Sequence, residues 1–286
     1  MSRARPLAVV LAALALFAPG AAHAGNEREL TLMTYNIHHG VGVDDRLDLK
    51  RIAHLIRAQD AEVVGLQEVD RHFDARSDFQ DQARLLARML RMHHVYGANL
   101  DFDSFEPGQP RRQYGTAILS RFPILDHENT LLPKFEGSEQ RGLLEALVNV
   151  RGVRFRVYGT HLQHNSPTPE SGQAQRQLQV AAILAETAES AGRPHALVGD
   201  LNAQPQSLEM QPLLDPFGDA WSLAGEGDGF TIPSTGPTAR IDYVLVSPDI
   251  EVDRALVPSS LGSDHLPVVA ELELPRRGVL RSGLSP

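Results

Sequence analysis

The sequence predicts an α/β fold of mixed β-sheets with helices on their outer faces, and three observations lead to it. Short apolar runs rich in Val, Ile, Leu and Tyr alternate with stretches of helical spacing. Five of these runs have a polar residue at or just past their C-terminal end, whereas in the last two the polar residue comes first. No low-complexity linker or internal repeat divides the chain. If all these polar residues meet at one edge, the last two strands run antiparallel to the others, and the sheets are mixed.

Eight runs have the composition of buried strands, because their side chains are mostly apolar or β-branched. They span residues 30–36, 62–68, 115–120, 143–150, 155–161, 195–200, 241–247 and 266–274. The polar residues that end five of them are Asn36, Glu68, Ser120, His161 and Asp200. We expect these residues to meet in a cleft at one end of the sheets.

Three stretches between the strands have helical spacing. In the first, four apolar residues share one face: Leu49, Ile52, Ala53 and Ile56. Ser77 and Gln80 form a capping-box pattern that opens the second. The core-facing residues of the second helix are Leu85, Leu86, Met89 and Leu90. The third runs from about Glu170 to Ala191, with Gly192 in the C′ position. Such spacing indicates core packing, so we assign these residues no functional role.

The two ends of the chain differ from the segment between them. Residues 1–24 contain two arginines, a short apolar run and a final Ala-His-Ala, which is the pattern of a secretory signal peptide. The apolar run is shorter than the ~20 residues that span a bilayer. We therefore expect cleavage near Ala24, a secreted or periplasmic protein, one domain over residues 25–275 and a flexible tail over residues 276–286.

Composition limits the classes of protein that fit. The chain has no cysteine, so disulfides and thiolate metal sites are excluded. Residues 1–24 hold two arginines and no acid, so the rest carries 25 basic against 36 acidic side chains, a net charge of −11. This argues against a broad basic surface that follows a nucleic-acid backbone. Phosphate substrates are still compatible, because bound metal ions can reverse the local charge.

Eight polar residues, most of them at strand ends, form the candidate site. Singly, each has an ordinary explanation as a cap, a turn residue or a surface charge. Together, four carboxylates, two amides and two imidazoles suit a hard divalent cation such as Mg²⁺, with Mn²⁺ as an alternative, rather than zinc. The eight are Asn36, Glu68, His161, Asp200, Asn202, Asp242, Asp264 and His265.

Three other patterns that include histidine could indicate a different kind of site. Ser263 precedes an Asp-His pair, but the chain has no G-x-S-x-G elbow, and adjacent residues of an extended strand point to opposite faces. A serine hydrolase is therefore not expected. His38 and His39 either contribute to the cleft or belong to a loop. His161 and His164 have a metal-binding spacing only in a helix, so a zinc site is not expected there.

Seven segments, taken in order, resemble the motifs of the endonuclease/exonuclease/phosphatase superfamily, which includes pancreatic-type deoxyribonucleases, apurinic endonucleases and bacterial sphingomyelinases. They are TYNIHHG, VVGLQEVD, YGTAILSRFPI, GTHLQH, GDLNAQP, RIDYVLVS and SDHLPV. The resemblance covers about residues 30–274 and is specific for the superfamily rather than for one member. It implies a four-layer sandwich of two mixed β-sheets flanked by helices.

The resemblance also implies a metal site. Glu68 matches the principal metal-binding glutamate of the superfamily. Asn36 matches a residue that helps to hold the metal and the substrate phosphate. Asp264 is expected to bind the metal or to support its ligands. A cation held there would polarise the phosphoryl group and stabilise the departing alkoxide.

Five further positions match catalytic residues. Asp200 and Asn202 match the pair that orients the attacking water and contacts the phosphoryl oxygens. His265 matches the catalytic histidine, and Asp242 matches the acid paired with it. His161 matches a histidine that contacts the phosphate or the leaving oxygen. The superfamily assigns the general base differently among Asp and His, so that assignment stays open.

Several residues are candidates for contacts with the substrate. Arg111 and Arg141 lie in loops and suit a phosphate contact. Tyr114 occupies a position where the superfamily often has an aromatic or basic residue. Arg112 and Arg176 are expected to be solvated surface charges.

These observations predict a secreted, Mg²⁺-dependent phosphoester hydrolase, in the first place a phosphodiesterase. A nuclease is the default within the superfamily, and a hydrolase of phospholipid headgroups or another small phosphoester follows closely. Its partner is then the phosphoester itself, and no protein partner is implied. Residues 100–110 are acidic and short rather than a long exposed apolar hairpin, so stable membrane insertion is not expected. The alternative is a non-catalytic phosphate-binding module, which the retention of every catalytic position disfavours.

Overall fold

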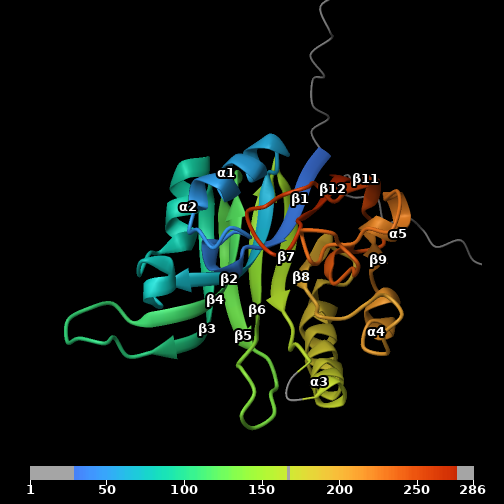
Figure 1. Ribbon diagram of the computed structural model, residues 1–286. Coiled ribbons are helices and arrows are strands. Elements are labelled where there is room, and N and C mark those ends of the chain that lie inside the picture. Colours follow the sequence, from blue (N-terminus) through green and yellow to red (C-terminus); the bar gives the residue numbers. More distant parts are fainter. Residues whose placement is uncertain (1–28, 166–167, 276–286) are drawn as a thin grey trace, which may run out of the picture.

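The computed structural model describes residues 29–165 and 168–275 (Figure 1). The predicted signal peptide, residues 1–24, and the predicted tail, residues 276–286, lie outside the described residues. The domain boundaries therefore stay predictions. Among the described helices, none is long and apolar enough to cross a membrane.

Two mixed six-stranded sheets form the centre of the molecule. The first has the order β11-β12-β1-β2-β4-β3. Its strands are β1 (Glu29–Asn36), β2 (Val63–Arg71), β3 (His93–Phe102), β4 (Arg112–Ser120), β11 (Glu251–Leu256) and β12 (Val268–Glu273). The second has the order β5-β6-β7-β8-β10-β9. Its strands are β5 (Ile124–Leu131), β6 (Gly142–Val150), β7 (Val153–His161), β8 (His195–Asp200), β9 (Gly218–Asp219) and β10 (Asp242–Val246).

The largest hydrophobic cluster lies between the two sheets. Leu32 and Ile118 contribute to it from the first sheet, and Val157 and Val198 from the second; all four are fully buried. Burying one such side chain contributes about 1.5–3 kcal/mol. Gly65 in β2 allows a close approach of the sheets, because a Cβ at this position would collide with the Val198 side chain. The sheets are therefore held together tightly near the end that carries the candidate site.

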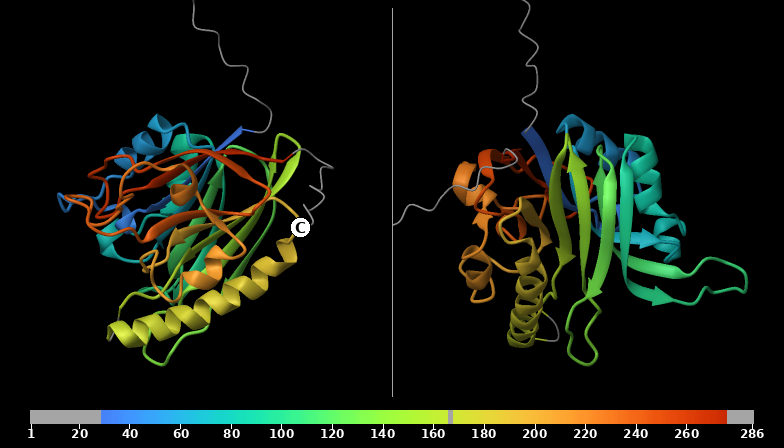
Figure 2. Two further views of the ribbon diagram at one scale, coloured as in Figure 1. Left: turned by 90° about the vertical axis from the view of Figure 1, so that its right-hand side faces the viewer. Right: turned by 180° about the vertical axis from the view of Figure 1, so that it is seen from behind.

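Helices cover the outer face of each sheet, which gives four layers (Figures 1 and 2). The first sheet packs against α1 (Leu49–Ala58) and α2 (Gln82–Leu90). The second packs against α3 (Pro169–Thr187) and α4 (Gln211–Leu214). Beside β10 and β11 lies the short α5 (Ala220–Ala224). The α/β four-layer sandwich of two mixed sheets is thus confirmed.

The strand directions explain why the candidate residues converge. β1 and β2 are parallel, as are β7 and β8, whereas β12 and β10 run antiparallel to β1 and β8. Asp200 therefore lies directly opposite Asp242 and beside His161. Ser120 does not join them: β4 is antiparallel to β2, which pairs Ser120 with Val63 at the start of β2. Including Ser120 was wrong, because composition does not reveal a strand's direction.

The helix predictions are confirmed in part. The four predicted residues of the first helix are the buried face of α1. The second helix begins later than predicted: α2 has Asp81 as its N-cap, with its carboxylate accepting from the Arg84 N–H. Ser77 instead ends the 3-10 helix η2 (Ala75–Ser77), so the predicted capping box is wrong. After α3, the 3-10 helix η3 (Ala188–Ser190) ends just before Gly192, which has φ 73°.

The strands that the sequence analysis missed are β3, β5, β9 and β11, and all four lie at sheet edges. An edge strand is partly solvated, so polar residues interrupt its apolar pattern. β3 and β4 form a long hairpin that projects from the sandwich, on the left of Figure 1. Phe102 and Phe105 near its tip are 46% and 64% exposed. The segment 100–110 is acidic as expected, but it lies at the tip of this hairpin and exposes two phenylalanine rings.

Candidate active site

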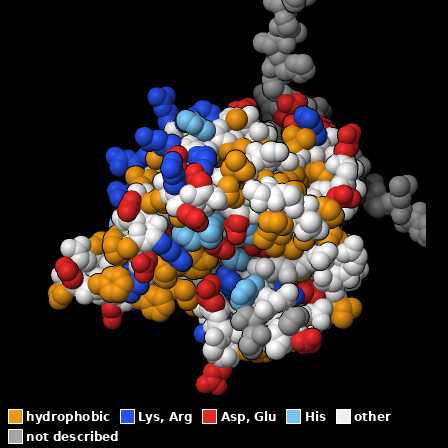
Figure 3. Space-filling view, in the orientation of Figure 1, with side chains coloured by type: hydrophobic (Ala, Val, Ile, Leu, Met, Phe, Trp, Pro, Cys, Tyr) orange, Lys and Arg blue, Asp and Glu red, His pale blue; other side chains and the backbone are white. Residues whose placement is uncertain are grey.

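A pocket of about 590 Å³ opens where the candidate residues converge. Side chains from both sheets and from the loop 136–139 line it. Figure 3 shows histidine and acidic side chains close together in the middle of this face. The predicted residues on its wall are Glu68, Tyr114, Arg141, His161, Asp200, Asn202 and His265. The tertiary structure therefore brings Glu68 and His265, which are far apart in the sequence, to one cavity.

Asp200, Asp242 and His265 form a buried group on the inner wall. His265 follows a turn in which its backbone N–H donates to the Ser263 hydroxyl at 3.1 Å. Its Nδ1 lies 2.9 Å from Asp242 Oδ2, and its Nε2 lies 3.7 Å from Asp200 Oδ2. Because Asp242 fixes the ring through Nδ1, the other ring nitrogen is directed toward Asp200 and the pocket.

Burial and charge shift the pKa values of this group. Burial works against a charged His265 ring, but Asp242 and Asp200 outweigh it and raise the His265 pKa to about 10. Burial, followed by repulsion from Asp242, raises the pKa of Asp200 to about 7. The histidine is therefore an imidazolium at neutral pH, and the Asp200 carboxyl titrates near neutrality.

His161 lies on the other side of Asp200. Its Nδ1 is 3.0 Å from Arg141 Nη1, and because a guanidinium can only donate, Nδ1 accepts. Its Nε2 lies 3.4 Å from Asp200 Oδ2 and 3.1 Å from Asn202 Nδ2. Burial, then Arg141 and His265, hold the His161 pKa well below its usual value. His161 is thus a neutral ring that lies between Arg141, Asn202 and Asp200.

Asn36 positions carboxylates. Its amide nitrogen donates to Glu68 Oε1 and to Asp200 Oδ2, both at 3.1 Å. Its oxygen accepts the backbone N–H of His38 at 3.1 Å. The Asn36 side chain therefore connects Glu68 to the buried group and orients both carboxylates, and its predicted contacts with metal and phosphate stay predictions.

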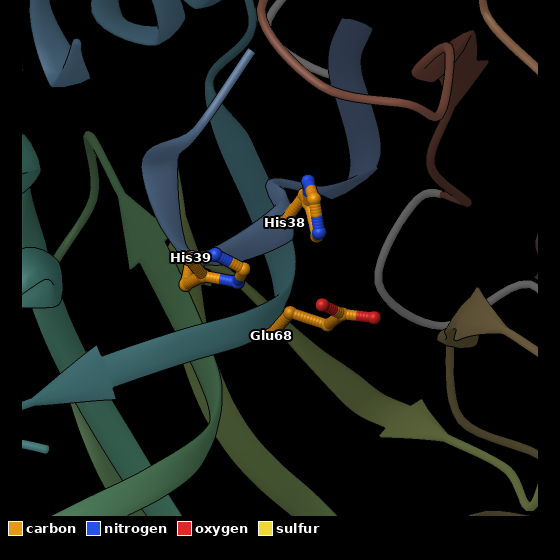
Figure 4. Close-up of side chains that lie close together, drawn as sticks. All are labelled: His38, His39 and Glu68. Carbon is orange, nitrogen blue, oxygen red and sulfur yellow. The ribbon is translucent and has the colours of Figure 1, made fainter. Parts of the chain in front are cut away.

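Glu68 is directed toward the pocket by an irregularity in β2. The register of β2 against β4 shifts between Leu66 and Val69, and Glu68 has φ 57°, so this bulge re-aims the side chain. Beside it lies the 3-10 helix η1 (His38–Gly40), which carries His38 and His39. Figure 4 shows the three side chains close together. Burial, then Arg76 and His38, lower the His39 pKa to about 4.

The donor set around Glu68 fits a divalent cation. One nitrogen of His38, one of His39 and one oxygen of Glu68 lie within 4.8 Å of one another. Asp264, expected at the metal, lies beside His38, with its Oδ1 3.9 Å from His38 Nδ1, and its metal contact stays a prediction. Glu68 and the two histidines are therefore the residues that would hold a cation. A cation there would supply positive charge at the phosphate.

The predicted substrate contacts separate into two groups. Arg141 is buried on the pocket wall and pairs with Glu139 at 2.9 Å. Tyr114 is also buried on that wall, and desolvation raises its pKa well above the usual value. Arg111 lies outside the pocket: it is exposed on the β3–β4 hairpin and paired with Asp101 at 2.6 Å. The structure does not bring Arg111 to the site, because local carboxylates engage it on the hairpin.

Two arginines that were expected to be solvated are not. Arg176 is buried, donates to Glu209 at 2.7 Å and donates to the Gln163 carbonyl at 2.9 Å. Arg112 stacks over the Phe105 ring, 3.6 Å from its centroid. Both expectations were wrong, since a helix or loop position does not reveal what packs over it.

The pocket also contains residues that the sequence analysis did not select. Glu136 and Glu139 come from the loop between β5 and β6, and Gln163 and His164 follow β7. The loop residues carry no spacing signal, because an irregular segment has no period that assigns a side chain to one face. His164 belongs to the quoted segment GTHLQH, and its place beside His161 was the available signal.

Comparisons with known proteins agree with this geometry. Residues 33–265 match the model of the Endonuclease/Exonuclease/phosphatase family. The uncharacterized protein YbhP of Escherichia coli (strain K12) is 28% identical over 265 residues, covering 85% of this chain and 96% of its own length.

Solved structures agree as well. An endonuclease/exonuclease/phosphatase from Beutenbergia cavernae has a TM-score of 0.72 at 29% identity, over 87% of this chain and 72% of that one. Mannosyl-6-phosphatase Bt3783 of Bacteroides thetaiotaomicron has a TM-score of 0.68 at 19% identity, over 85% and 99%, a likeness that shows the fold alone. The family match spans most of the sequence and includes the residues that line the pocket, from Glu68 to His265. The chain therefore belongs to the endonuclease/exonuclease/phosphatase family.

Proposed function

We propose that the protein is an exported, divalent-metal-dependent hydrolase of phosphoesters. One observation carries this proposal: a buried carboxyl, Asp200, stands between a neutral His161 and a charged His265 at the wall of a pocket that Glu68 also lines. Phosphoester hydrolysis needs an oriented water, a proton acceptor and positive charge at the phosphoryl oxygens. These three requirements correspond to different residues of the pocket.

Each residue has a role that follows from its protonation. Asp200, with a pKa raised to about 7 by burial and by Asp242, accepts a proton from the water that attacks phosphorus. His265 stays charged because Asp242 and Asp200 outweigh its burial, so it donates to a phosphoryl oxygen and is a poor base. His161 and Asn202 orient the water and the phosphate. A cation held by Glu68 would add positive charge at the phosphate and stabilise the alkoxide that leaves when its bond to phosphorus breaks.

The pocket favours a compact substrate. Its volume of about 590 Å³ is in the range of small-molecule sites, about 300–1,000 Å³. Glu136 and Glu139 on its loop wall, together with the net charge of −9, repel an extended polyanion. A small phosphoester is therefore the leading substrate class.

A nuclease that acts on single strands is the second candidate, and a specific feature favours it. An aromatic series leads away from the pocket: Tyr114 lies 5.7 Å from Phe73, and Phe73 lies 6.2 Å from Phe102, measured between ring centroids. The Arg76 guanidinium lies over Phe73 and Tyr114. Aromatic rings and guanidinium groups of this kind stack on unpaired bases.

Hydrolysis of bis-p-nitrophenyl phosphate with and without added Mg²⁺ or Mn²⁺ tests the catalytic proposal. We expect metal-dependent turnover in the wild type and its loss in Asp200→Ala and His265→Ala. Equal background in all three proteins would support a non-catalytic binding module instead. Arg111→Ala is the matched control, because Arg111 lies outside the pocket.

A side-by-side panel separates the substrate classes: p-nitrophenyl phosphate, sugar phosphates, phospholipids, single-stranded oligonucleotides and plasmid DNA. Preference for the small esters supports the leading class. Preference for oligonucleotides, reduced in Phe102→Ala, supports the nuclease. Export is tested separately by the mass of the mature protein recovered outside the cytoplasm, for which we expect a chain that begins near Gly25.

A further inference from the structure

The cluster of His38, His39 and Glu68 at the edge of the pocket differs in chemistry from an all-oxygen magnesium site. Two of its three donor atoms are imidazole nitrogens, and all three lie within 4.8 Å of one another. Figure 4 shows the two rings and the carboxylate close together. Mg²⁺ prefers oxygen ligands, whereas imidazole suits transition-metal ions.

The backbone at all three residues is held in an unfavourable conformation. His38, His39 and Glu68 have φ 44°, 43° and 57°, in the left-handed region that residues other than glycine seldom adopt. Such residues cost about 1–3 kcal/mol each and persist only where their surroundings fix them. Here Gln82 at the start of α2 donates to the His39 carbonyl at 2.6 Å, and Asn36 accepts the His38 N–H.

The donor atoms are also available. His39 Nδ1 is a buried atom with no hydrogen-bond partner among the described residues. His38 Nδ1 faces Asp264 Oδ1 at 3.9 Å, which is too long for a hydrogen bond. No hydrogen bond to another described residue therefore occupies either of these two nitrogens.

We propose that His38, His39 and Glu68 form a binding site for a transition-metal ion of the Zn²⁺, Co²⁺ or Mn²⁺ kind, which the chain prefers to Mg²⁺. The site supplies two imidazole nitrogens and one carboxylate. This inference deepens the proposed metal dependence and rests on it only for its catalytic consequence, because binding is measured without substrate.

The test is metal binding to the full-length, chelator-stripped protein, measured by titration calorimetry with Zn²⁺ and with Mg²⁺. We expect one tight Zn²⁺ site per chain, with an affinity at least about 100-fold above that for Mg²⁺. His38→Asn and His39→Asn remove the imidazole yet retain a residue that accepts a positive φ. Each should weaken Zn²⁺ binding at least about tenfold and change Mg²⁺ binding little.

Two further variants complete the design. Glu68→Gln should weaken the binding of both metals, because it removes the shared carboxylate. His54→Asn, on the exposed face of α1, should change neither. The visible absorption of bound Co²⁺ gives an independent readout, which should change in the His38 and His39 variants. Circular dichroism confirms that each variant is folded.

The outcomes are distinct. Similar affinities for Zn²⁺ and Mg²⁺, or Zn²⁺ binding unchanged in both histidine variants, would overturn the proposal. Zn²⁺ binding lost in Asp242→Asn and retained in the histidine variants would also overturn it, because the buried group would then be the site. A protein that binds Zn²⁺ as expected and hydrolyses no phosphoester would uphold this inference and refute the proposed function.

Discussion

Two clusters of metal-ligating residue types lie at the same end of the sandwich. One consists of Asp200, Asp242 and His265 and is buried; the other consists of His38, His39 and Glu68 and is partly exposed. Asn36 connects them through its bonds to Asp200 and Glu68. Both have ligand atoms within 4.8 Å of one another, so proximity alone does not distinguish their chemistry.

The difference between the clusters lies in how their polar atoms are used. In the buried cluster, His265 is committed to Asp242, and Asp200 accepts from Asn36 and from the Asn202 N–H. Those contacts shift protonation equilibria, which suits proton transfer. In the partly exposed cluster, the strained backbone at His38 and His39 fixes the two rings, and no hydrogen bond joins the described side chains of the cluster. In our proposal, proton transfer and metal binding therefore belong to neighbouring but separate groups of residues.

The largest expected effect tests whether proton transfer and metal binding belong to separate clusters. Asp200→Ala and His265→Ala should each lower kcat/KM by about 10²–10⁴-fold, because each removes a proton-transfer or charge-stabilising group. Zn²⁺ affinity should stay within about threefold of the wild type. Steady-state kinetics and calorimetry measure the two quantities. A parallel loss of metal affinity in both variants would show that the clusters form one site.

A smaller effect is expected when the buried histidine loses its partner. Asp242→Asn should lower kcat about 10–100-fold, because the His265 pKa falls and its ring is no longer fixed. Asp242 is a main cause that raises the His265 pKa to about 10. The decline of activity on the alkaline side of the pH profile should therefore begin at a lower pH in the variant than in the wild type. An NMR titration of His265 checks the direction. A variant with an unchanged His265 titration would contradict the assignment.

The pH dependence sharpens the assignment of Asp200. Its pKa is raised to about 7, chiefly by burial, so kcat/KM should rise with pH up to about 7 and fall about tenfold per pH unit below. A cation bound at Glu68 should move the acid limb of the pH–rate profile to lower pH, because a nearby positive charge favours the ionised form of Asp200. The measurement is a pH–rate profile at two metal concentrations. A limb that stays in place would argue against Asp200 as the titrating group.

The titration of Asp200 should also appear in the free energy of unfolding, which falls over the pH range in which kcat/KM rises. The folded pKa of Asp200 lies above its unfolded value, so the wild type loses stability as pH rises from about 4 to about 7. Asp200→Asn does not titrate, so its stability relative to the wild type should increase by about 3 kcal/mol between pH 5 and pH 8. Thermal unfolding in the presence of chelator measures this. A constant difference at both pH values would contradict the burial argument.

The smallest effect is expected outside both clusters. Arg111→Ala should change kcat/KM on a small phosphodiester by less than about twofold, because Asp101 and Asp103 engage Arg111 on the exposed hairpin. Arg141→Ala is the contrasting variant, since Arg141 contacts His161 at 3.0 Å. Equal losses in the two variants would place the hairpin at the substrate after all.

The sequence was informative wherever a single side-chain pattern decides the local structure. The buried central strands appeared as apolar runs, and the buried face of α1 appeared as a spacing of three and four. Edge strands such as β3 and β5 did not, because solvation allows polar residues to break their alternation. The start of α2 was misplaced for a related reason: a capping-box pattern at Ser77 competes with the actual cap at Asp81.

The sequence predicted many of the residues that line the pocket, but it did not predict which contacts they make there. Asp200, Asn202, His161 and His265 were selected from strand ends, and the structure brings them to one cavity. Arg111 and Arg141 looked equivalent in the sequence, yet one is exposed and the other buried. That difference depends on which distant segments pack around each side chain, and no local spacing contains this information.

The sequence by itself determined the central strands, the direction of the last two, the superfamily and the residues that converge at one edge. These properties follow from hydrophobic periodicity and from polar residues at strand ends, which are local. Only the tertiary structure decided that Asn36 orients two carboxylates, that Ser120 lies at the opposite end and that His38 and His39 stand beside Glu68. Those outcomes depend on sheet pairing, burial and backbone strain, which arise when segments distant in sequence meet.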